Sequence, residues 1–345
     1  MKLSFTSALV LVFIATVTFY SCARMGSGSE ERVSHGDVSV GGVLTVTVST
    51  PIGFVIPSAI TDASSSEIGT HIHCGLVNLD PGLLDVVPAI AESWSIDDKK
   101  TSYVFNLRKG VLFHKDACFG SGNREITAED FKYSFEQLCG QDELGAFETT
   151  FANRVEGADA FHNGEASEIS GVQVIDDYTL RIRLIKPEQS FLFVLAQPST
   201  AAIAEKAMLK YGSESKIGAG PFVMKTVGKE MLLVRNDEYY QTDAFGNHLP
   251  YLDTLIVKTV STKSNQLEQF LEGQLDVVSG LYLDPVRDVL ESQMANFSGK
   301  NPKYIMVREE ESAGYESYTI YRANLKGFGS NFMGYRNFSQ VQIEQ

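Results

Sequence analysis

The sequence has few cysteines, a single tryptophan, ten prolines and a shortage of positive charge. Among its 345 residues, 29 are Lys or Arg and 43 are Asp or Glu, which gives a formal net charge of −14. Recognition of nucleic-acid phosphates needs a positive stripe, so this composition excludes that class of partner. The four cysteines form no C-x-x-C pair, and their spacing therefore does not indicate a zinc or redox site.

The sequence patterns of common catalytic sites are also missing. The chain has no G-x-S-x-G elbow, P-loop, G-x-G-x-x-G turn or H-E-x-x-H helix. His71 and Cys74 can share one helix face, with His73 beside them, but two neighbours are too few to hold a metal ion. We favour a packed histidine next to a buried cysteine. We therefore predict that the protein is not an enzyme and needs no metal or cofactor.

One short apolar run, at residues 8–18, follows a cationic start at Lys2. It is too short to span a bilayer, which takes about 20 apolar residues, and it is typical of a secretory signal. The run ends at Tyr20-Ser21-Cys22, and a small residue directly before Cys resembles a bacterial lipobox. Tyr20 departs from the commonest form of that box, so ordinary cleavage with Cys22 incidental is the alternative.

From this N-terminal pattern we expect an exported protein that is lipid-anchored through Cys22 and faces the periplasm or the exterior. Residues 1–22 are the predicted lipoprotein signal, and residues 23–38 are a Gly/Ser/charged tether. No later segment is long and apolar enough to span a membrane. The body is therefore predicted to lie outside the bilayer.

The remaining chain is large and apolar enough for an extensive core. Hydrophobic residues make up 43% of the sequence, and a body of this length fits two domains or one large one. An exported chain can form disulfides. Cys118 and Cys139 flank a loop and a predicted helix, so a bridge between them is one pairing, with Cys74 a buried free thiol. The sequence leaves the pairing open.

Local patterns predict a mixture of strands and helices. Residues 43–48 are β-branched and read as a first strand, and apolar residues alternate over 103–107, as in a half-buried strand. A helix is predicted over 64–76, and another, capped by Thr127, carries an apolar stripe at Phe131, Phe135 and Leu138. Residues 172–185 have the pattern of a β-hairpin.

Two further segments are predicted: residues 201–211 form a helix closed by Gly212, and Glu309–Glu311 is a solvated loop. The chain from Tyr315 onward shows little periodicity and gives no prediction of secondary structure.

Seven blocks in the chain occur in one order and resemble a known family. They are GGVL at 41–44, GLVNLD at 75–80, PAIAESW at 88–94, SYVFNLRKGVLFH at 102–114, ITAEDFKYSFEQLC at 126–139, GAGPF at 218–222 and FLEGQLD at 270–276. Together they resemble the family 5 solute-binding proteins of ABC importers, which include peptide- and nickel-binding lipoproteins and periplasmic receptors. Ala219 stands where the family has Thr, and Gln274 where it has Glu.

The resemblance implies an α/β fold of the class II periplasmic-binding-protein type, with two lobes joined by a hinge. Family members are considerably longer than this chain, so we expect the second lobe to be largely missing. The implied division is a first lobe at 39–63 and 191–279, a small subdomain of that lobe at 64–190, and the start of an incomplete second lobe at 280–345.

The resemblance also implies a function and a site. A chain of this type captures oligopeptides or dipeptides outside the cytoplasmic membrane and, as a monomer, delivers them to ABC permease subunits. Peptide-binding members hold the ligand main chain as an added strand. By position, Thr61, Asp62 and Ala63 match the loop that meets peptide, and Tyr282 matches the crossover at the cleft.

Other functions remain in view from the sequence. A family member can bind nickel complexes or oligosaccharides in place of peptides. A surface lipoprotein can use the scaffold for adhesion or sensing without transport. An exported hydrolase would need a converging nucleophile and base, and the sequence offers no candidates.

Overall fold

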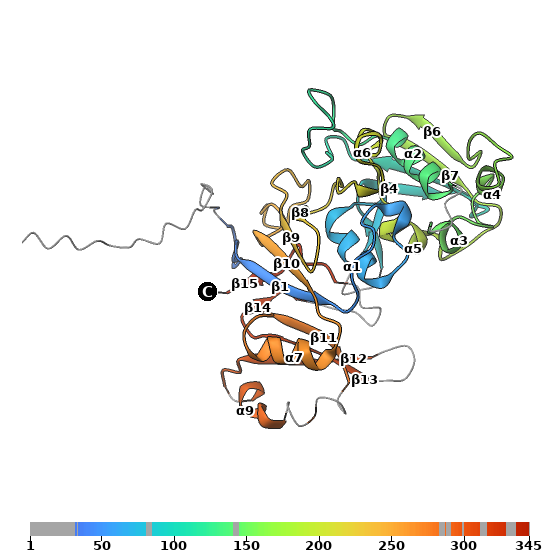
Figure 1. The fold of residues 1–345 in the computed structure, drawn as a ribbon. Helices are drawn as coiled ribbons and strands as arrows, with labels where there is room; N and C mark the ends of the chain where they lie inside the picture. Colours follow the sequence, from blue (N-terminus) through green and yellow to red (C-terminus); the bar gives the residue numbers. More distant parts are fainter. Residues whose placement is uncertain are drawn as a thin grey trace, which may run out of the picture. The chain divides into compact units, whose positions relative to one another are not determined.

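The computed structural model describes residues 32, 34–80, 85–140, 145–282, 287, 291–298, 300–310, 316–328 and 336–344. Residues 34–345 form one compact unit, distinct from residues 1–33. Cys22 and the predicted signal lie outside the described residues. Within the described part of the chain, no helix has the length and apolar character needed to cross a bilayer. Figure 1 shows the strands and helices of the larger unit.

The first sheet contains the predicted N-terminal strand. Its strands are β1 (Val43–Val48), β10 (Thr254–Thr259), β9 (Glu230–Arg235) and β8 (Phe222–Thr226), in that spatial order. β1 and β10 are parallel, and the other pairs are antiparallel. Helix α1 (Ala63–Ile72) places Ile68 and Ile72 in the same core as Leu44 and Val46 of β1, so this helix covers the first sheet.

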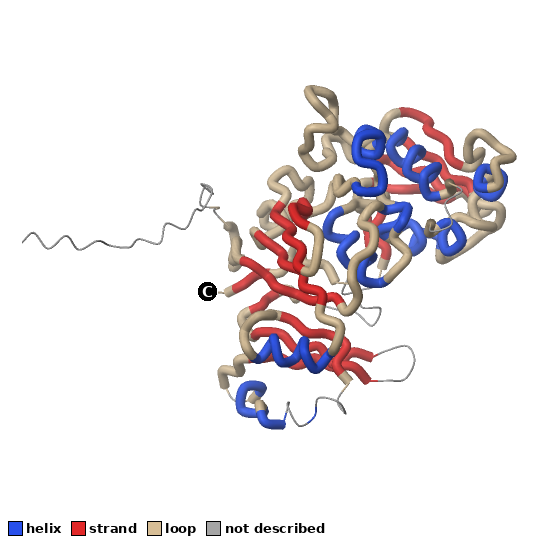
Figure 2. The backbone as a smooth tube through the Cα atoms, in the orientation of Figure 1, coloured by secondary structure: helices blue, strands red, loops and turns tan. Residues whose placement is uncertain are grey.

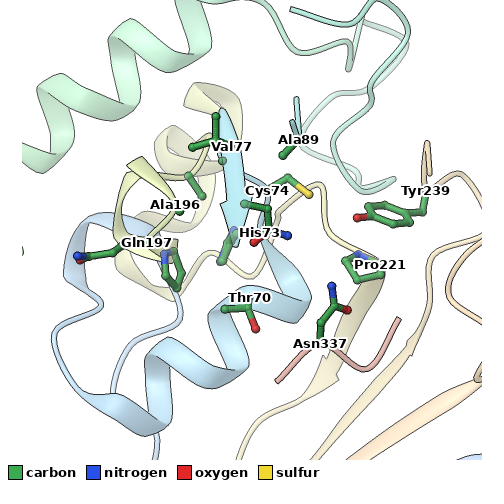
Figure 3. Close-up of a pocket in the computed structure, with 14 residues that line it drawn as sticks. Thr70, His73, Cys74, Val77, Ala89, Ala196, Gln197, Pro221, Tyr239 and Asn337 are labelled. Carbon is green, nitrogen blue, oxygen red and sulfur yellow. The ribbon is translucent and has the colours of Figure 1, made fainter. Parts of the chain in front are cut away.

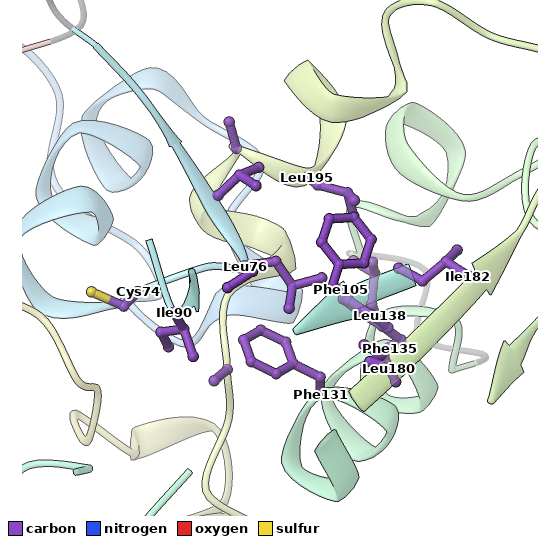
Figure 4. Close-up of a cluster of buried hydrophobic side chains, with 14 of the residues drawn as sticks. Cys74, Leu76, Ile90, Phe105, Phe131, Phe135, Leu138, Leu180, Ile182 and Leu195 are labelled. Atoms are coloured by element: carbon purple, nitrogen blue, oxygen red, sulfur yellow. The ribbon is translucent and has the colours of Figure 1, made fainter. Parts of the chain in front are cut away.

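The second sheet is antiparallel and has the order β4-β5-β7-β6. Its strands are β4 (Ala91–Ile96), β5 (Ser102–Leu107), β7 (Thr179–Arg183) and β6 (Val172–Asp176), with helix α2 (Ala128–Leu138) packed beside them. Phe105 of β5 meets Phe131 and Phe135 of α2 in the largest core of the described chain, which Figure 4 shows. The sequence predicted both the strand alternation and the helix stripe, because burial of one face sets each period.

A third sheet follows at the C-terminal side of the sequence. It has the order β11 (Val277–Leu281), β13 (Glu316–Arg322) and β12 (Tyr304–Glu310), and helix α7 (Lys263–Leu271) lies against it (Figure 2). The smaller elements are η1 (Pro57–Ala59), β2 (Val77–Leu79), β3 (Val86–Pro88), α3 (Phe147–Thr150), α4 (Ala158–His162), α5 (Phe191–Leu195), η2 (Pro198–Thr200), α6 (Glu205–Tyr211), η3 (Gly212–Glu214), α9 (Met294–Phe297), β14 (Leu325–Lys326) and β15 (Gln342–Ile343).

Several predicted boundaries differ from the structure. The helix expected over 64–76 ends at Ile72, because His73 is extended and the chain enters β2. The helix expected from residue 201 begins at Glu205. Strand β12 includes Glu309 and Glu310, so the loop expected at these two positions was wrong, and Glu311 lies outside the described residues. Two segments also pack outside the part of the fold expected for them. Helix α1, expected in the small subdomain, joins the core of the first sheet, and Phe191, expected in the first lobe, joins the core of the second.

The expected pairing of Cys118 with Cys139 is not formed. The three described cysteines are free thiols. Cys139 is buried at the C-terminal cap of α2, whereas Cys118 lies in the loop that precedes this helix, where its N–H donates to Asp116 Oδ1 at 2.7 Å. Cys118 lies near Asp116 and Lys210, whereas Cys139 lies near Glu136 and Asp159, so the two thiols have different neighbours.

The first and third sheets are joined through Asp276. Its Oδ2 accepts the N–H of Thr45 at 2.8 Å, and its own N–H donates to the Thr45 carbonyl at 2.9 Å. Arg322 Nε donates to Asp276 Oδ1 at 3.0 Å, while Arg322 Nη2 reaches the carbonyls of Phe270 and Leu275. One carboxylate thus contacts β1 of one sheet and β13 of another.

The two larger cores meet at the glycine-rich segment 218–222. His114 accepts the N–H of Gly218 at Nδ1 (3.3 Å) and donates from Nε2 to the Gly220 carbonyl (3.0 Å). A Cβ atom on Gly218 would lie 2.0 Å from the Ile72 carbonyl oxygen, and one on Gly220 would lie 2.6 Å from the His71 carbonyl oxygen. Both positions therefore need glycine because the backbones approach too closely for a side chain.

Three buried histidines surround this junction, and among the described residues none belongs to a cluster of three or more potential metal-binding side chains. Burial lowers the pKa of His71 and His73 to about 3 and that of His114 to about 4. His73 donates from Nε2 to the Val55 carbonyl at 2.6 Å. His71 stacks on the Phe338 ring with centroids 4.6 Å apart, and neither of its ring nitrogens has a hydrogen-bond partner.

We predict that D276N destabilises the fold by about 1–3 kcal/mol, because a charge-assisted contact to Arg322 is lost while the side-chain size is kept. Urea unfolding at pH 7 measures the change. E272Q is the matched control, since Glu272 is exposed and accepts only from the nearby Gln274. A D276N protein as stable as E272Q would contradict the bridging role.

We also predict that stability falls as the pH drops below about 6.5, the pKa of histidine in the unfolded chain. Below that pH the histidines of the unfolded chain bind protons, whereas the buried histidines of the folded chain stay neutral. The free energy of unfolding therefore falls with pH until the folded pKa values of about 3 to 4 are reached. H71L should reduce the slope of unfolding free energy against pH by about 1.4 kcal/mol per pH unit between pH 6 and 4. Urea titrations at several pH values measure it, and an unchanged slope in H71L would refute the assignment.

Candidate functional site

The carboxyl ends of β1 and β10 form one edge of the first sheet. In open α/β sheets, ligands bind beyond the carboxyl ends of parallel strands. The N–H of Val260 donates to the Val48 carbonyl at 3.0 Å, so the two strands end side by side. Gln266 of α7 is fully buried and donates from Nε2 to the Val260 carbonyl and to Ser49 Oγ, which fixes the first turns of α7 at the same edge.

The predicted residues Thr61, Asp62 and Ala63 are all exposed and lie at the N-terminus of α1. Asp62 Oδ1 accepts the N–H of Ser65 at 2.9 Å, which makes Asp62 the cap of the helix. Thr50, just after β1, shares a 2.7 Å hydrogen bond with the hydroxyl of Ser64. This contact ties the first turn of α1 to the carboxyl end of β1.

Tyr282 directly follows β11, and 45% of its surface is exposed. The Lys263 ammonium of α7 donates to the Ser279 carbonyl at 2.6 Å, so the end of β11 is tied to the same helix that Gln266 holds at the sheet edge. Gly280 has φ +62°, and a Cβ atom there would lie 3.5 Å from Lys263 Nζ. The chain therefore turns closely over the lysine before it presents the Tyr282 ring.

The structure thus brings both predicted groups to one edge, Thr61–Ala63 through α1 and Tyr282 through α7. An exposed segment and one exposed aromatic ring can contact a ligand main chain and cover it. Sequence reasoning missed Gln266 and Lys263. The sequence signal that could have identified them is a pair of polar side chains in the first turns of a helix that directly follows a strand.

A small cavity lies at the other end of α1, and Figure 3 shows it. It is lined by Thr70, His73, Cys74, Gly75, Val77, Asn78, Ala89, Ala196, Gln197, Pro198, Ala201, Pro221, Tyr239 and Asn337. The centre of a water-sized sphere can move within about 20 Å³ of this cavity, which is room for a single water molecule. The cavity is therefore too small for a peptide.

Cys74 in this cavity is not a reactive thiol. Burial raises its pKa to about 12, although hydrogen bonds with Tyr239 and Tyr240 oppose that shift. The thiolate is the nucleophile and the metal ligand, so a thiol with this pKa is inert at neutral pH. The position is explained by packing.

Residues 85–326 match the family described as bacterial extracellular solute-binding proteins, family 5 (middle region). Heme-binding protein A of Haemophilus influenzae is 25% identical, with 90% of this chain and 57% of that protein aligned. The dipeptide-binding protein of Escherichia coli is 27% identical, with 76% of this chain and 47% of that protein aligned. The chain spans about half the length of these relatives.

Solved structures share the fold. The periplasmic binding protein DppA of Helicobacter pylori, in complex with the peptide STSA, aligns with a TM-score of 0.63 at 23% identity, over 79% of this chain and 51% of that one. The murein tripeptide-binding protein MppA of Escherichia coli aligns with a TM-score of 0.66 at 20% identity, again over 79% and 51%. With the family match covering well over half of its residues, the chain belongs to the family 5 bacterial extracellular solute-binding proteins.

Proposed function

We propose that this protein is the substrate-binding component of an ABC importer and captures oligopeptides or dipeptides outside the cytoplasmic membrane. The observation that carries the proposal is the exposure of Thr61–Ala63 and Tyr282, which are tied to the carboxyl end of β1 and to β11, in a chain of this family. A relative of the same fold is known in complex with a peptide. As a monomer, the protein would deliver its ligand to the permease subunits.

The proposed site uses backbone more than charge. Thr61 and Ala63 are exposed residues beside a helix start that Asp62 caps, and the cap holds this segment in place. A peptide main chain that binds there gains affinity from backbone hydrogen bonds and leaves its side chains unread. The Tyr282 ring, anchored through Lys263 and Ser279, covers the ligand from the β11 side.

We further propose the lobe assignment that the family implies, with a first lobe at 39–63 and 191–279, a subdomain at 64–190 and the start of a second lobe at 280–345. The separate hydrophobic cores of the three sheets support a division into several parts, but the packing of α1 with the first sheet and of Phe191 with the second departs from these limits. The proposed site lies where the first lobe passes into the second, which is where a hinged clamp closes on its ligand.

Heme is the second candidate ligand, because heme-binding protein A aligns with more of this chain than the dipeptide-binding protein does. We favour peptide because the described residues at the site provide exposed backbone and an aromatic ring. The histidines nearest to α1 are buried and tied to packing. The two ligands are separate arms of the same test.

We expect a mixed di- and oligopeptide pool to give binding heat in calorimetry of the complete gene product, and hemin to give none. Y282A should weaken peptide binding about tenfold, because an aromatic contact of about 1 kcal/mol or more is lost. Y282F is the control and should bind like the parent. Heat from hemin and silence from peptides would overturn the peptide assignment.

We also propose export and lipid anchoring, with signal residues 1–22, lipid on Cys22 and a tether over 23–38. The sequence pattern before Cys22 supports this proposal. In general, a lipid anchor is stronger when a second acyl chain or a second membrane-binding signal is present. We expect labelled fatty acid to be incorporated into the wild-type protein and not into C22A, with C22A recovered in the soluble fraction. Equal label in both proteins would refute attachment at Cys22.

A further inference from the structure

Residues 34–40, here called the strap, lie on the folded body, so residues 34–38 of the proposed tether are bound to the body in this structure. Asn247 holds the strap by a reciprocal pair of hydrogen bonds: the N–H of His35 donates to Asn247 Oδ1 at 2.7 Å, and Asn247 Nδ2 donates to the His35 carbonyl at 2.9 Å. An amide side chain that bonds both groups of one residue mimics a neighbouring strand. The strap is therefore held by its backbone, whatever side chain it carries at position 35.

The loop 243–247 is arranged for this contact by its own hydrogen bonds. Asp243 Oδ1 accepts the backbone N–H of Asn247 at 2.8 Å, and Oδ2 accepts Asn247 Nδ2 at 2.7 Å and the Tyr251 hydroxyl at 2.6 Å. Asn247 is 94% buried, with 6% of its surface exposed. Its amide is thus already oriented before it meets the strap.

Further contacts hold the strap at separate points. A Cβ atom on Gly36, which has φ +77°, would lie 3.3 Å from the Phe245 ring, so only glycine fits there without strain. The N–H of Ser39 donates to Gln342 Oε1 at 2.8 Å. Between these points the strap and the chain at Ile343 and Glu344 border an open hollow of about 510 Å³, so the strap is not sealed along its length.

Two glycines separate the strap from strand β1. Gly41 and Gly42 have φ +99° and +95°, a backbone region in which glycine has little steric cost. The N–H of Gly41 donates to the Tyr251 carbonyl at 2.8 Å. These residues form a pivot on which the strap can leave the body while β1 remains in its sheet.

We propose that the loop 243–247 is a clasp for the strap, and that opening of this clasp lengthens the membrane tether. This inference rests on the proposed lipid anchor at Cys22 for its consequence, although the clasp itself does not. Opening of the clasp releases residues 34–40 from the body and adds them to the proposed tether. The seven residues released extend the reach of the body by up to about 24 Å, at ~3.4 Å per residue.

Hydrogen–deuterium exchange of the full chain tests the clasp. In the parent, the amides of His35 and Ser39 should exchange on the order of tenfold slower than in a free peptide, because each donates a hydrogen bond to the body, to Asn247 and Gln342 respectively. N247A leaves the Gln342 acceptor in place, yet it should bring the Ser39 amide to the free-peptide rate and should allow an Asp-specific protease to cut before Asp37. Amides of β1 should be unchanged.

Two strap variants make the test decisive. H35A keeps both backbone groups and should exchange like the parent, whereas H35P removes the donated N–H and should release the strap without altering the loop. If N247A disturbs the whole fold, H35P decides the question. Free-peptide exchange of the parent strap, or parent-like exchange in H35P, would overturn the clasp. Failure of the anchor is read separately, from C22A remaining in the membrane fraction.

Discussion

The Asp276 carboxylate is the contact on which the arrangement of this molecule depends. It binds the backbone of β1 on one side and the Arg322 guanidinium of β13 on the other. Strand β11 begins beside Thr45 and ends near Lys263, so it runs in the same direction as β1. Three strand ends and the first turns of two helices therefore meet at one edge, and this edge is the candidate site.

The segments that carry the family resemblance pack the core and do not form the candidate site. The GAGPF segment is shaped by contacts with Ile72 and His114, and its first and third residues are glycine because neighbouring carbonyls leave no room for a Cβ atom. The blocks around Phe105 and Phe131 fill the main core. These positions identify the fold because they are packed, and for the same reason they reveal little about the ligand.

Much of the fold could be predicted from local patterns, and the failures have physical causes. The strand at 103–107, the helix capped by Thr127 and the hairpin at 172–185 each show a period set by one buried face. Strands β12 and β13 were not predicted, because β-pairing depends on distant neighbours and the acidic run at Glu309 disguised the first of them. The disulfide was wrong because sequence spacing does not reveal which cysteines the fold brings together. At the site, Thr61–Ala63 and Tyr282 were expected from resemblance, but the roles of Gln266 and Lys263 required the folded topology.

The central claim is that ligand binds along the carboxyl edge of β1, β10 and β11. The most direct test is a structure of the complete gene product with a bound peptide. The account predicts that the peptide main chain lies against the backbone of Thr61–Ala63 and under the Tyr282 ring. A peptide bound away from this edge, for example on the sheet that contains β5, would contradict it.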